Sequence, residues 1–340
     1  ATVTPSGSFA PTGNVEFTFY TNGSCTGDGA AFCTVALDGS NPGIALPCNV
    51  TVWLGACTYA FQASWTGDTN YTGDTSECEY FTVSQGTSTV TTTLHSGASA
   101  DDGETPTVVA VGGSVDLGTV MHDLATVTPS GSFAPTGNVE FTFYTNGSCT
   151  GDGAAFCTVA LDGSNPGIAH PSNDTGSLAA GNYAFQASWA GDDNYTGDTS
   201  ECEYFTVSQG TSTVTTTLHQ GTSTGETTPI VVAVGGSVDL GTVMHDLATV
   251  TPSGSFAPTG DVDFTFYENN ACTGDGTAYG SVALVAGVAH PSNSTVALAA
   301  GAYSFKASWA GDDNYTGNTS ECEPFTVDKA QLTLTTAVHN

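Results

Sequence analysis

The sequence repeats itself, and this repetition constrains its fold more than any single motif does. Residues 1–45 are identical to residues 125–169, and a looser copy of the same block starts at Ala248. The copies therefore start 124 and then 123 residues apart. Such a period is too long for one solenoid unit and matches a whole β-domain. The chain is predicted to be a tandem array, and its 340 residues are enough for two or three domains with cores of their own.

Alternating apolar and polar residues predict β-strands within each copy. In residues 138–145 and 182–189, apolar side chains occupy every second position, so one face of each strand is apolar. Gly, Pro, Asn and Asp mark the turns between further predicted strands, at 155–161, 203–207, 213–219 and 237–250. About seven short strands in roughly 120 residues favour an all-β fold class, namely tandem immunoglobulin-like (Ig-like) β-sandwich domains.

A recurring strand pattern sets the predicted domain boundaries. TSTVTTTLH follows shortly after FTV in two copies, and QLTLTTAVH at residues 331–339 has the same place in the third. Complete Ig-like repeats are therefore predicted at residues 84–207 and 208–327. Residues 1–83 are predicted to be a repeat without its first strand and most of its second. Residues 328–340 then contain the first strand of a next repeat, or a donor strand.

The incomplete first repeat poses a physical problem, because a sandwich without these strands exposes core residues and unpaired backbone groups. Two explanations stay open. The chain is a window of a longer repeat protein, which agrees with a start at Ala1 without an initiator methionine or a signal peptide. Alternatively, the strand at 331–339 of one copy completes the first domain of another by strand addition. In both cases the predicted partners are copies of the repeat, arranged end to end.

The charge balance limits the other partners. The formal net charge is −31, from 33 acidic residues against two lysines, Lys306 and Lys329. Nucleic acid and anionic membrane surfaces are excluded as partners by like-charge repulsion. The sequence contains no run of 18 apolar residues, so membrane insertion is not predicted. No cofactor is predicted to be required, and calcium is the one cofactor that the charge favours.

Ten cysteines in an acidic, turn-rich chain predict an oxidising, extracellular setting. The third copy has only two cysteines, so any bridge within it must join them, and the matching cysteines are paired by analogy in the other copies. The predicted disulfides are Cys25–Cys78, Cys149–Cys202 and Cys272–Cys322. A fourth, Cys48–Cys57, is predicted because these two cysteines together replace Ser172 and Gly181. The state of Cys33 and of its equivalent Cys157 stays open.

Several motifs of the chain resemble those of a known family. PTGNVEFTFYTNGSCTG, LAAGNYAFQASWAGDDNY, TSECEYFTV and the VDKA near the end are similar to the bacterial Ig-like domain repeats (group 3 type) of large secreted and cell-surface proteins. The resemblance covers nearly the whole chain, with a departure at Trp65, Trp189 and Trp309, where tyrosine is common. It implies an Ig-like fold, no enzymatic activity, and a role as a spacer in stalks, adhesin shafts or filament bodies.

The acidic stretch SWAGDDNYTGDTSECE at 188–203, with near copies at 64–79 and 308–323, is the densest group of chemically active side chains. Catalysis is not expected, because its carboxylates lie in a turn and at a strand start, outside any cleft, and recur in every copy. The preferred interpretation is a solvated turn in which an aspartate bonds to turn amides. The other is a calcium site, with candidate ligands Asp192, Asp193, Asp198, Asp68 and Asp312.

The histidines show no spacing of a metal site. No H-x-x-x-H or H-E-x-x-H pattern occurs among the seven histidines. His122 and His245, within MHDLATV, are predicted to be packed or hydrogen-bonded in a strand, without a metal.

Asn-x-Ser/Thr sequons predict N-glycosylation. The prediction is strongest for PCNVT, PSNDT and PSNST, where Asn and Thr persist although the residue between them changes. In order of preference, the predicted sites are Asn49, Asn173 and Asn293, then Asn70, Asn194 and Asn314, then Asn22 and Asn146.

These features together predict a non-enzymatic structural protein, extracellular or on a cell surface. Domains that each contain a disulfide, joined by linkers of two or three residues, would form a stiff stalk or a head-to-tail fibril. The alternative is an adhesin that binds a carbohydrate or protein receptor. Only the first copy has a divergent insert, LPCNVTVWLGAC, in which Trp53 is the candidate sugar-stacking residue. A locally stapled strand edge is the simpler interpretation of this insert.

Overall fold

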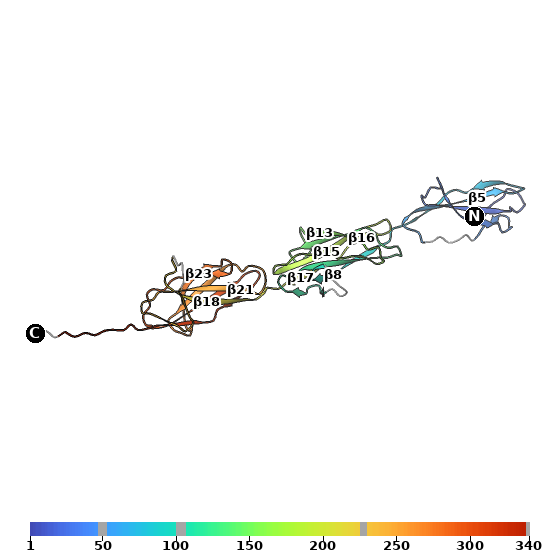
Figure 1. Cartoon of the computed structure of the whole chain (residues 1–340). Helices are drawn as coiled ribbons and strands as arrows, with labels where there is room; N and C mark the ends of the chain where they lie inside the picture. Colours follow the sequence, from blue (N-terminus) through green and yellow to red (C-terminus); the bar gives the residue numbers. More distant parts are fainter. Residues whose placement is uncertain (47–52, 100–106, 225–229, 338–340) are drawn as a thin grey trace.

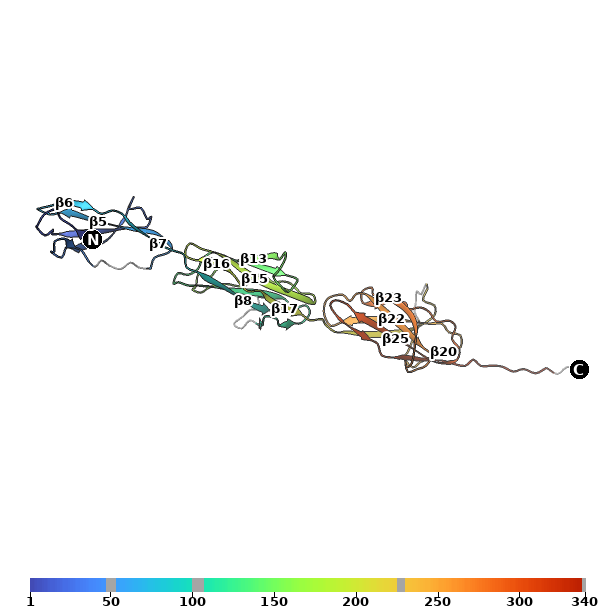
Figure 2. The same ribbon diagram turned by 180° about the vertical axis from the view of Figure 1, so that it is seen from behind.

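The computed structural model describes residues 1–46, 53–99, 107–224 and 230–337. Within them the chain forms strands and turns and no α-helix. Three β-domains follow one another along a rod, and residues 328–337 extend from its end (Figure 1; Figure 2 gives the view from behind). The described part of the chain thus provides no helix with the length and apolarity needed to cross a bilayer. The predicted all-β fold of tandem Ig-like sandwiches is confirmed.

The second domain is a complete sandwich of two sheets. Its strands are β8 (Ser88–Ser96), β9 (Thr107–Val109), β10 (Ser114–Val115), β11 (Met121–Pro129), β12 (Asn138–Tyr144), β13 (Ala154–Ala160), β14 (Gly167–Ala169), β15 (Gly181–Gly191), β16 (Thr196–Thr199) and β17 (Glu203–Val207). The larger sheet has the order β10-β17-β15-β12-β13, with β16 also paired to β15, and the smaller has the order β14-β11-β8-β9. Only β10 and β17 run parallel; the other pairs of this domain are antiparallel.

Alternating side chains of the two sheets form the core of this domain. Phe141 on β12 and Trp189 on β15 are buried against Val90 and Val127 of the smaller sheet. Trp189 also donates its indole N–H to the carbonyl of Thr136 at 3.0 Å. The predicted apolar faces at 138–145 and 182–189 are therefore the faces that meet the smaller sheet, because every second residue of a strand points to the same side.

The third domain repeats this layout, with one difference from the sequence-based expectation. Its strands are β18 (Ser212–Gln220), β19 (Ile230–Val232), β20 (Ser237–Val238), β21 (Met244–Pro252), β22 (Asp261–Tyr267), β23 (Thr277–Ala283), β24 (Val288–Ala289), β25 (Gly301–Gly311), β26 (Thr316–Thr319) and β27 (Glu323–Val327). The single strand predicted at 237–250 is wrong, because it is two strands in different sheets. A turn separates them, in which Gly241 has φ +83° and Thr242 N–H donates to the Asp239 carbonyl at 3.1 Å.

The first domain has the larger sheet but little of the smaller one. Its strands are β1 (Thr2–Val3), β2 (Asn14–Tyr20), β3 (Ala30–Ala36), β4 (Gly43–Ile44), β5 (Cys57–Gly67), β6 (Thr72–Thr75) and β7 (Glu79–Val83). The sheet of order β3-β2-β5-β6, with β7 beside β5, faces only the short pair of β1 and β4. Among the described residues of this domain, nothing corresponds to β8, β9 and β10. Phe81 is consequently 37% exposed, whereas its equivalent Phe205 in the second domain is 1% exposed.

Candidate functional site

The acidic stretch of each repeat forms a turn that its own aspartate anchors. In the turn between β15 and β16, Asp192 Oδ1 accepts the N–H groups of Asn194 at 2.8 Å and Tyr195 at 3.0 Å. Asp192 Oδ2 accepts the backbone N–H of Thr136 at 2.9 Å and its hydroxyl at 3.1 Å. Asp68 and Asp312 make the same bonds in the other two domains. The recurring aspartate therefore ties its turn to the loop before the second strand of the larger sheet.

In the first domain, the hydrogen-bond donors around Asp68 lower the pKa of its carboxyl group. Bonds from the backbone amides of Asn70 and Thr12 are the main causes that lower the pKa of Asp68. A carboxylate that accepts several N–H groups stays ionised more readily, because the donors stabilise the negative form. The recurring aspartate thus bonds to the amides of its own turn, as the preferred interpretation of the acidic stretch predicted.

The other aspartates of the stretch serve different ends. Asp198 Oδ2 accepts the N–H of Val90 at 3.0 Å, and Asn318, its counterpart in the third domain, donates instead to the Ser212 carbonyl at 2.7 Å. Asp193 is exposed. The described residues contain two groups of three side chains that are close enough to hold a metal ion, and neither group includes an aspartate. Calcium at Asp192, Asp193, Asp198, Asp68 or Asp312 stays a prediction.

The same turn forms the contact between successive domains. Asn194 Oδ1 accepts the N–H of Ala56 from the first domain at 2.9 Å, and Asn314 Oδ1 accepts the N–H of Ala180 from the second domain at 3.0 Å. Each accepting asparagine lies two residues after the anchoring aspartate of its own domain. A short turn that is fixed internally thus presents one polar atom to the preceding domain.

The linker between the second and third domains is bonded at every position. Ser208 N–H donates to the Val115 carbonyl of the second domain at 2.9 Å. Gln209 Nε2 donates to the Asp312 carbonyl at 2.8 Å, and Gly210 N–H donates to the Asn314 carbonyl at 2.9 Å. No residue between the two domains is therefore left to pivot freely.

Leu117 adds an apolar contact to this junction. It lies between β10 and β11 and packs against the core of its own domain and that of the third domain. A Cβ atom on Gly210 would lie 3.1 Å from Leu117 Cδ2, and one on Gly254 would lie 3.4 Å from it, so glycine at both places makes room for the leucine. The equivalent residue at the outer end of the third domain, Leu240, is 50% exposed.

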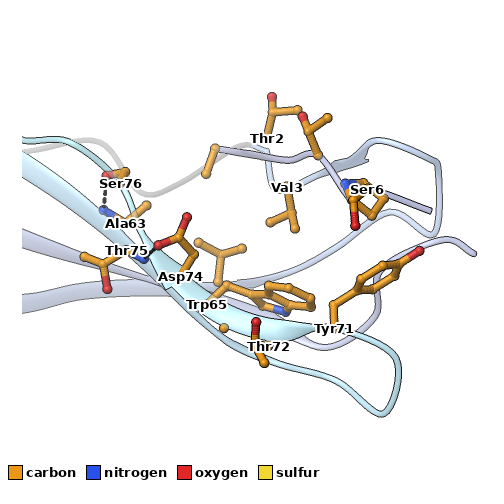
Figure 3. Close-up of a pocket in the computed structure, with 15 residues that line it drawn as sticks. Thr2, Val3, Ser6, Ala63, Trp65, Tyr71, Thr72, Asp74, Thr75 and Ser76 are labelled. Carbon is orange, nitrogen blue, oxygen red and sulfur yellow. Dashed lines mark hydrogen bonds between the residues drawn. The ribbon is translucent and has the colours of Figure 1, made fainter.

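The first domain carries an open groove where the other domains hold a strand. Residues 1–6 and 72–76 form its sides, and Val15, Trp65 and Tyr71 contribute apolar surface to a volume of about 520 Å³ (Figure 3). In the second domain β8 fills the equivalent place, where Ser88 Oγ donates to the Thr196 carbonyl at 2.8 Å. Asp74, the counterpart of Asp198, lines the groove.

Each complete domain contains a pair of buried carboxyl groups. Asp123 lies on β11 and Glu203 on β17, and Asp246 and Glu323 are their equivalents in the third domain. Burial raises the pKa of Asp123 well above its ordinary value, and repulsion by Glu203 raises this pKa further. Burial also raises the pKa of Glu203, against a bond from the Thr92 side chain that lowers it. These pairs therefore hold protons at a higher pH than exposed carboxyl groups do.

Each domain has a disulfide that lies at one end of its larger sheet. These three disulfides are Cys25–Cys78, Cys149–Cys202 and Cys272–Cys322, and they join residues 53, 53 and 50 positions apart. Each one links the turn after the second strand of the larger sheet to the start of the last strand of its domain. A loop of this length is stabilised by about 4 kcal/mol on the chain-entropy model.

The other cysteines differ from the sequence-based expectation. The predicted Cys48–Cys57 bridge does not form, because Cys57 is a free, exposed cysteine. As the first residue of β5 it pairs with Val83, and its Sγ donates to the Thr21 carbonyl at 3.7 Å. Cys48 itself lies outside the described residues. Cys33 is disulfide-bonded, whereas its equivalent Cys157 is a free, half-buried cysteine.

The environment of Cys157 lowers the reactivity of its thiol. Its Sγ accepts the N–H of Asn173 at 3.2 Å. Burial is the main cause that raises the pKa of this thiol, so little thiolate forms near neutral pH.

The sequons occupy two kinds of surface. Asn194 and Asn314 lie in the domain junctions, where a glycan would have to fit beside the preceding domain. The other predicted sites that the structure describes lie in exposed turns and loops, namely Asn22, Asn70, Asn146, Asn173 and Asn293. Asn49 lies outside the described residues. Glycosylation stays a prediction at all of these sites.

Sequence reasoning missed two clusters of three histidines. His122 and His245 are buried and hydrogen-bonded, because their Nδ1 atoms lie 3.1 Å and 3.0 Å from the carbonyls of Gly97 and Gly221. Each also has two further histidines beside it. The clusters are His95, His122 and His170 in the second domain, and His219, His245 and His290 in the third. The available signal was that all three positions recur in both complete copies, although local spacing shows nothing.

Comparisons with known proteins bear on the fold. Residues 224–328 match the family model of the bacterial Ig-like domain (group 3). A search of curated proteins found no match. Three similar solved structures are the C-terminal domain of the AgI/II polypeptide BspA of Streptococcus agalactiae, the C-terminal domain of the antigen I/II-family protein AspA of Streptococcus pyogenes, and a membrane-anchored protein of Corynebacterium diphtheriae.

The likeness to these three structures is distant. Sequence identity to this chain is 11%, 10% and 10%, and the TM-score is 0.24 for each. The alignments cover 70%, 70% and 98% of this chain, and 100%, 99% and 87% of the other chains. At these values the likeness carries no argument about function. The family match, in contrast, identifies residues 224–328 as a bacterial Ig-like domain of group 3, whose sequence motifs and strand order the second domain shares.

Proposed function

We propose that this chain is part of a stiff extracellular rod on or outside a bacterial cell, in which Ig-like domains act as structural spacers. The bonded junction between the second and third domains is the observation that carries this proposal. A linker whose residues are all hydrogen-bonded, with Leu117 packed into both cores, holds the domain axes at one angle. Relative motion is the ordinary expectation for domains with small polar interfaces, so these contacts mark a junction built to resist bending.

Other features agree with an extracellular spacer. Three disulfides fit an oxidising compartment. The high density of acidic side chains makes neighbouring parts of the rod repel each other, which opposes bending at low salt. The bacterial Ig-like domain family agrees with a place at a bacterial surface. The acidic turns act as anchors and junction contacts, and the proposal includes no enzymatic activity.

The extended segment at the end of the chain is complementary to the groove in the first domain, so this segment and a groove of the same kind would connect further domains into a longer rod. Leu332 and Leu334 are 96% and 93% exposed on the extended residues 328–337. In the strand pattern Leu334 has the place of Val90, which is buried in the core of the second domain. A strand of this type fills the groove of Figure 3, supplied by a longer chain or by a second copy.

Charge and hydrogen bonds favour this connection. Lys329 has the place of Gln209, whose side chain donates to the Asp312 carbonyl. A lysine there adds a positive charge next to the acidic turn of the following domain. Asp74 in the groove is placed to accept a backbone N–H from the incoming strand, as Asp198 accepts that of Val90.

The angle between the second and third domains tests the rod. We expect a narrow distribution of this angle in electron micrographs of the full chain, and a wider one for Asn314→Ala and Leu117→Ala. The matched controls are Asn70→Ala and Leu240→Ala, which change the same structural positions where no neighbouring domain is in contact, and they should leave the distribution unchanged. A wide distribution in the unmodified chain would contradict the proposal.

Association of the chain tests the connection between its ends. If a second copy supplies the strand, sedimentation velocity shows species that grow with concentration, and Leu334→Asp abolishes them. If the protein is longer, mass spectrometry of native material shows further repeats before Ala1 and the isolated chain stays monomeric. A monomeric chain in native material without further repeats would refute both forms of the connection.

A binding role rests on one side chain. Trp53 is 72% exposed in the first domain, and the second and third copies have no tryptophan at that place. An adhesin requires a ligand bound by the first domain alone. Glycan-array binding that Trp53→Ala removes would favour the adhesin over the pure spacer.

A further inference from the structure

We propose that each complete domain binds one divalent transition-metal ion, with Zn²⁺ as the representative, through three histidines, two on paired strands and one directly after a third strand. The ligands in the second domain are His95, His122 and His170, and those in the third domain are His219, His245 and His290. The site is independent of the structural role proposed above. It cross-links three segments of the smaller sheet of each domain.

Strand pairing places the three imidazoles together. His95 on β8 lies directly opposite His122 on β11. β14 pairs with β11 through Ala169 and Ala125, and His170 follows β14 directly. The third domain repeats this arrangement, with His219 opposite His245 and His290 following β24. Histidines 27 and 48 positions apart in the second domain, and 26 and 45 positions apart in the third, thus become neighbours.

The cluster lies on the outer face of the smaller sheet. Leu94 and Met121 belong to the core between the sheets. Successive side chains of a strand point to opposite sides, so His95 and His122 point away from that core. Both are nevertheless buried. A segment that includes Ser99 lies over this face, because Ser99 N–H donates to Asp174 Oδ1 at 2.8 Å.

The spacing of the rings matches a tetrahedral metal site. The ring centroids are 5.2, 5.3 and 5.6 Å apart in the second domain and 5.2, 5.1 and 5.5 Å apart in the third. Imidazoles that share one Zn²⁺ at Zn–N distances of about 2.0–2.1 Å have centroids about 5 Å apart. In both domains, one ligand atom from each histidine lies within 4.8 Å of the others. Three nitrogens that share one tetrahedral Zn²⁺ lie about 3.3 Å apart, so the ligand atoms must approach one another by at most about 1.5 Å to bind it.

Backbone acceptors prepare the central histidine for this role. His122 Nδ1 lies 3.1 Å from the Gly97 carbonyl and 4.0 Å from Asp174 Oδ1. His245 Nδ1 lies 3.0 Å from the Gly221 carbonyl. A carbonyl can only accept, so the neutral ring carries its proton on Nδ1 and its lone pair on Nε2. A histidine that binds a metal through one nitrogen commonly donates from the other to a carbonyl or carboxylate.

The donor set selects the class of ion. Imidazole nitrogen suits Zn²⁺, Co²⁺, Ni²⁺ and Cu²⁺, whereas Ca²⁺ and Mg²⁺ prefer oxygen ligands. Three protein ligands leave one coordination position for water or a nearby carboxylate. An ion that joins β8, β11 and the residue after β14 binds only the folded domain, so it raises the stability of that domain.

The first domain provides an internal control. Leu46 stands where the other copies have His170 and His290, so this domain cannot form the site even if another strand closes its groove. Leucine at this position is compatible with the fold, because the preceding residue, Ala45, is buried in the first domain as Ala169 is in the second. Substitution of His170 or His290 by leucine is therefore a conservative test.

Metal stoichiometry of the full chain tests the proposal. The protein would be purified without a histidine tag, with disulfides intact, and freed of metal by EDTA. Titration with Zn²⁺, followed by calorimetry and native mass spectrometry, should give two ions per chain. His170→Leu and His290→Leu should each lower this number to one, and the double variant to zero. Asp193→Asn is the control, and it should keep two ions.

Two further measurements separate a metal site from a structural histidine cluster. Co²⁺ should give the visible absorption of a tetrahedral site in the unmodified chain, and Zn²⁺ should remove it while Ca²⁺ should not. Zn²⁺ should slow hydrogen exchange in β11 and β21 and leave β5 of the first domain unchanged. If Zn²⁺ does not bind at tenfold molar excess, or if both leucine variants keep two ions, the proposal is wrong.

Discussion

The first and second domains share an identical block of 45 residues and still differ in how far they are closed. Val15 and Val139 are buried alike, and both domains make the same anchoring bonds at Asp68 and Asp192. The larger sheet therefore forms from its own sequence in both domains. Phe81 stays exposed while Phe205 is buried, because only the second domain has β8 and a full-length β11 in the opposite sheet. The larger sheet thus forms without a complete opposite sheet, whereas burial of its inner face requires that sheet.

The largest expected effect comes from supplying the missing strands. A chain that carries a copy of residues 84–124 before Ala1 should close the groove of the first domain. The copies of Val90, Leu94 and Met121 would be buried, which stabilises the domain by about 5 kcal/mol at the usual gain per apolar side chain. Hydrogen exchange of β5, whose sequence differs from that of β15, measures the change. An added segment with Val90→Asp and Leu94→Asp is the control, and equal exchange in both chains would contradict the comparison.

Removal of the disulfides should affect the two domains unequally. Replacing Cys25 and Cys78 by serine, or Cys149 and Cys202, removes about 4 kcal/mol of stability in either domain. The first domain lacks most of its smaller sheet, so we expect it to unfold while the second stays folded. Chymotryptic digestion followed by mass spectrometry distinguishes the two, since the chain has only two sites for trypsin. Equal resistance of the two variants to chymotrypsin would show that the open groove lowers the stability of the first domain only slightly.

The buried carboxyl pairs predict that the stability of the complete domains falls as the pH rises. The pKa values of Asp123 and Glu203 are raised by burial in the folded state. Their contribution to stability is therefore fully present below the unfolded pKa values, about 4, and is lost as the pH rises through the folded values. The second domain should therefore become less stable as the pH rises above about 4. Urea unfolding of the full chain, followed by hydrogen exchange in β11, measures this slope.

A matched pair of variants isolates the carboxyl effect. Glu203→Gln should flatten the slope, because the repulsion with Asp123 disappears. Glu79→Gln, at the equivalent place in the first domain, should change nothing, since Glu79 is exposed. A slope that Glu203→Gln leaves intact would assign the pH dependence to other groups.

The smallest expected effect concerns one hydrogen bond. Asp198→Ala removes the acceptor of the Val90 N–H and should lower the free energy of unfolding of the second domain by about 1 kcal/mol. Asp74→Ala should have a smaller effect on the first domain of the isolated chain, because none of its described strands takes the place of β8 beside Asp74 and only the bond from the Thr75 N–H is lost. If the Asp74 variant destabilises the chain only at high concentration, a second copy fills the groove.

The sequence predicted the elements that depend on local pattern. Alternation located β12, β15 and β17 to within about two residues, because an apolar stripe on a pleated strand repeats every second position. It merged β20 and β21 into one strand, since the turn around Gly241 interrupts the pairing without changing the apolar pattern. The pairing of Cys272 with Cys322 followed from their being the only cysteines of the third copy.

The candidate sites were predicted less completely, for a physical reason. Asp192 anchors a turn through amides two and three residues away, which sequence reasoning reached. Leu117 contacts a domain that begins 91 residues later, and no local signal marks it. The predicted disulfide of Cys57 with Cys48 was wrong. The direction of the Cys57 side chain depends on the pairing of β5 with β7, and these strands meet only in the folded sheet.

By itself, the sequence determined that the chain is a tandem array of β-domains, each with an internal disulfide and an acidic turn. Identity between copies and period-two alternation are properties of the linear chain. The tertiary structure alone decided which residues meet across that array. His95 and His122 lie on two strands and His170 directly follows a third, so their convergence depends on strand register and strand order. Register is set by the packing of the whole sandwich, so the histidine clusters and the junction at Leu117 became visible only in the folded protein.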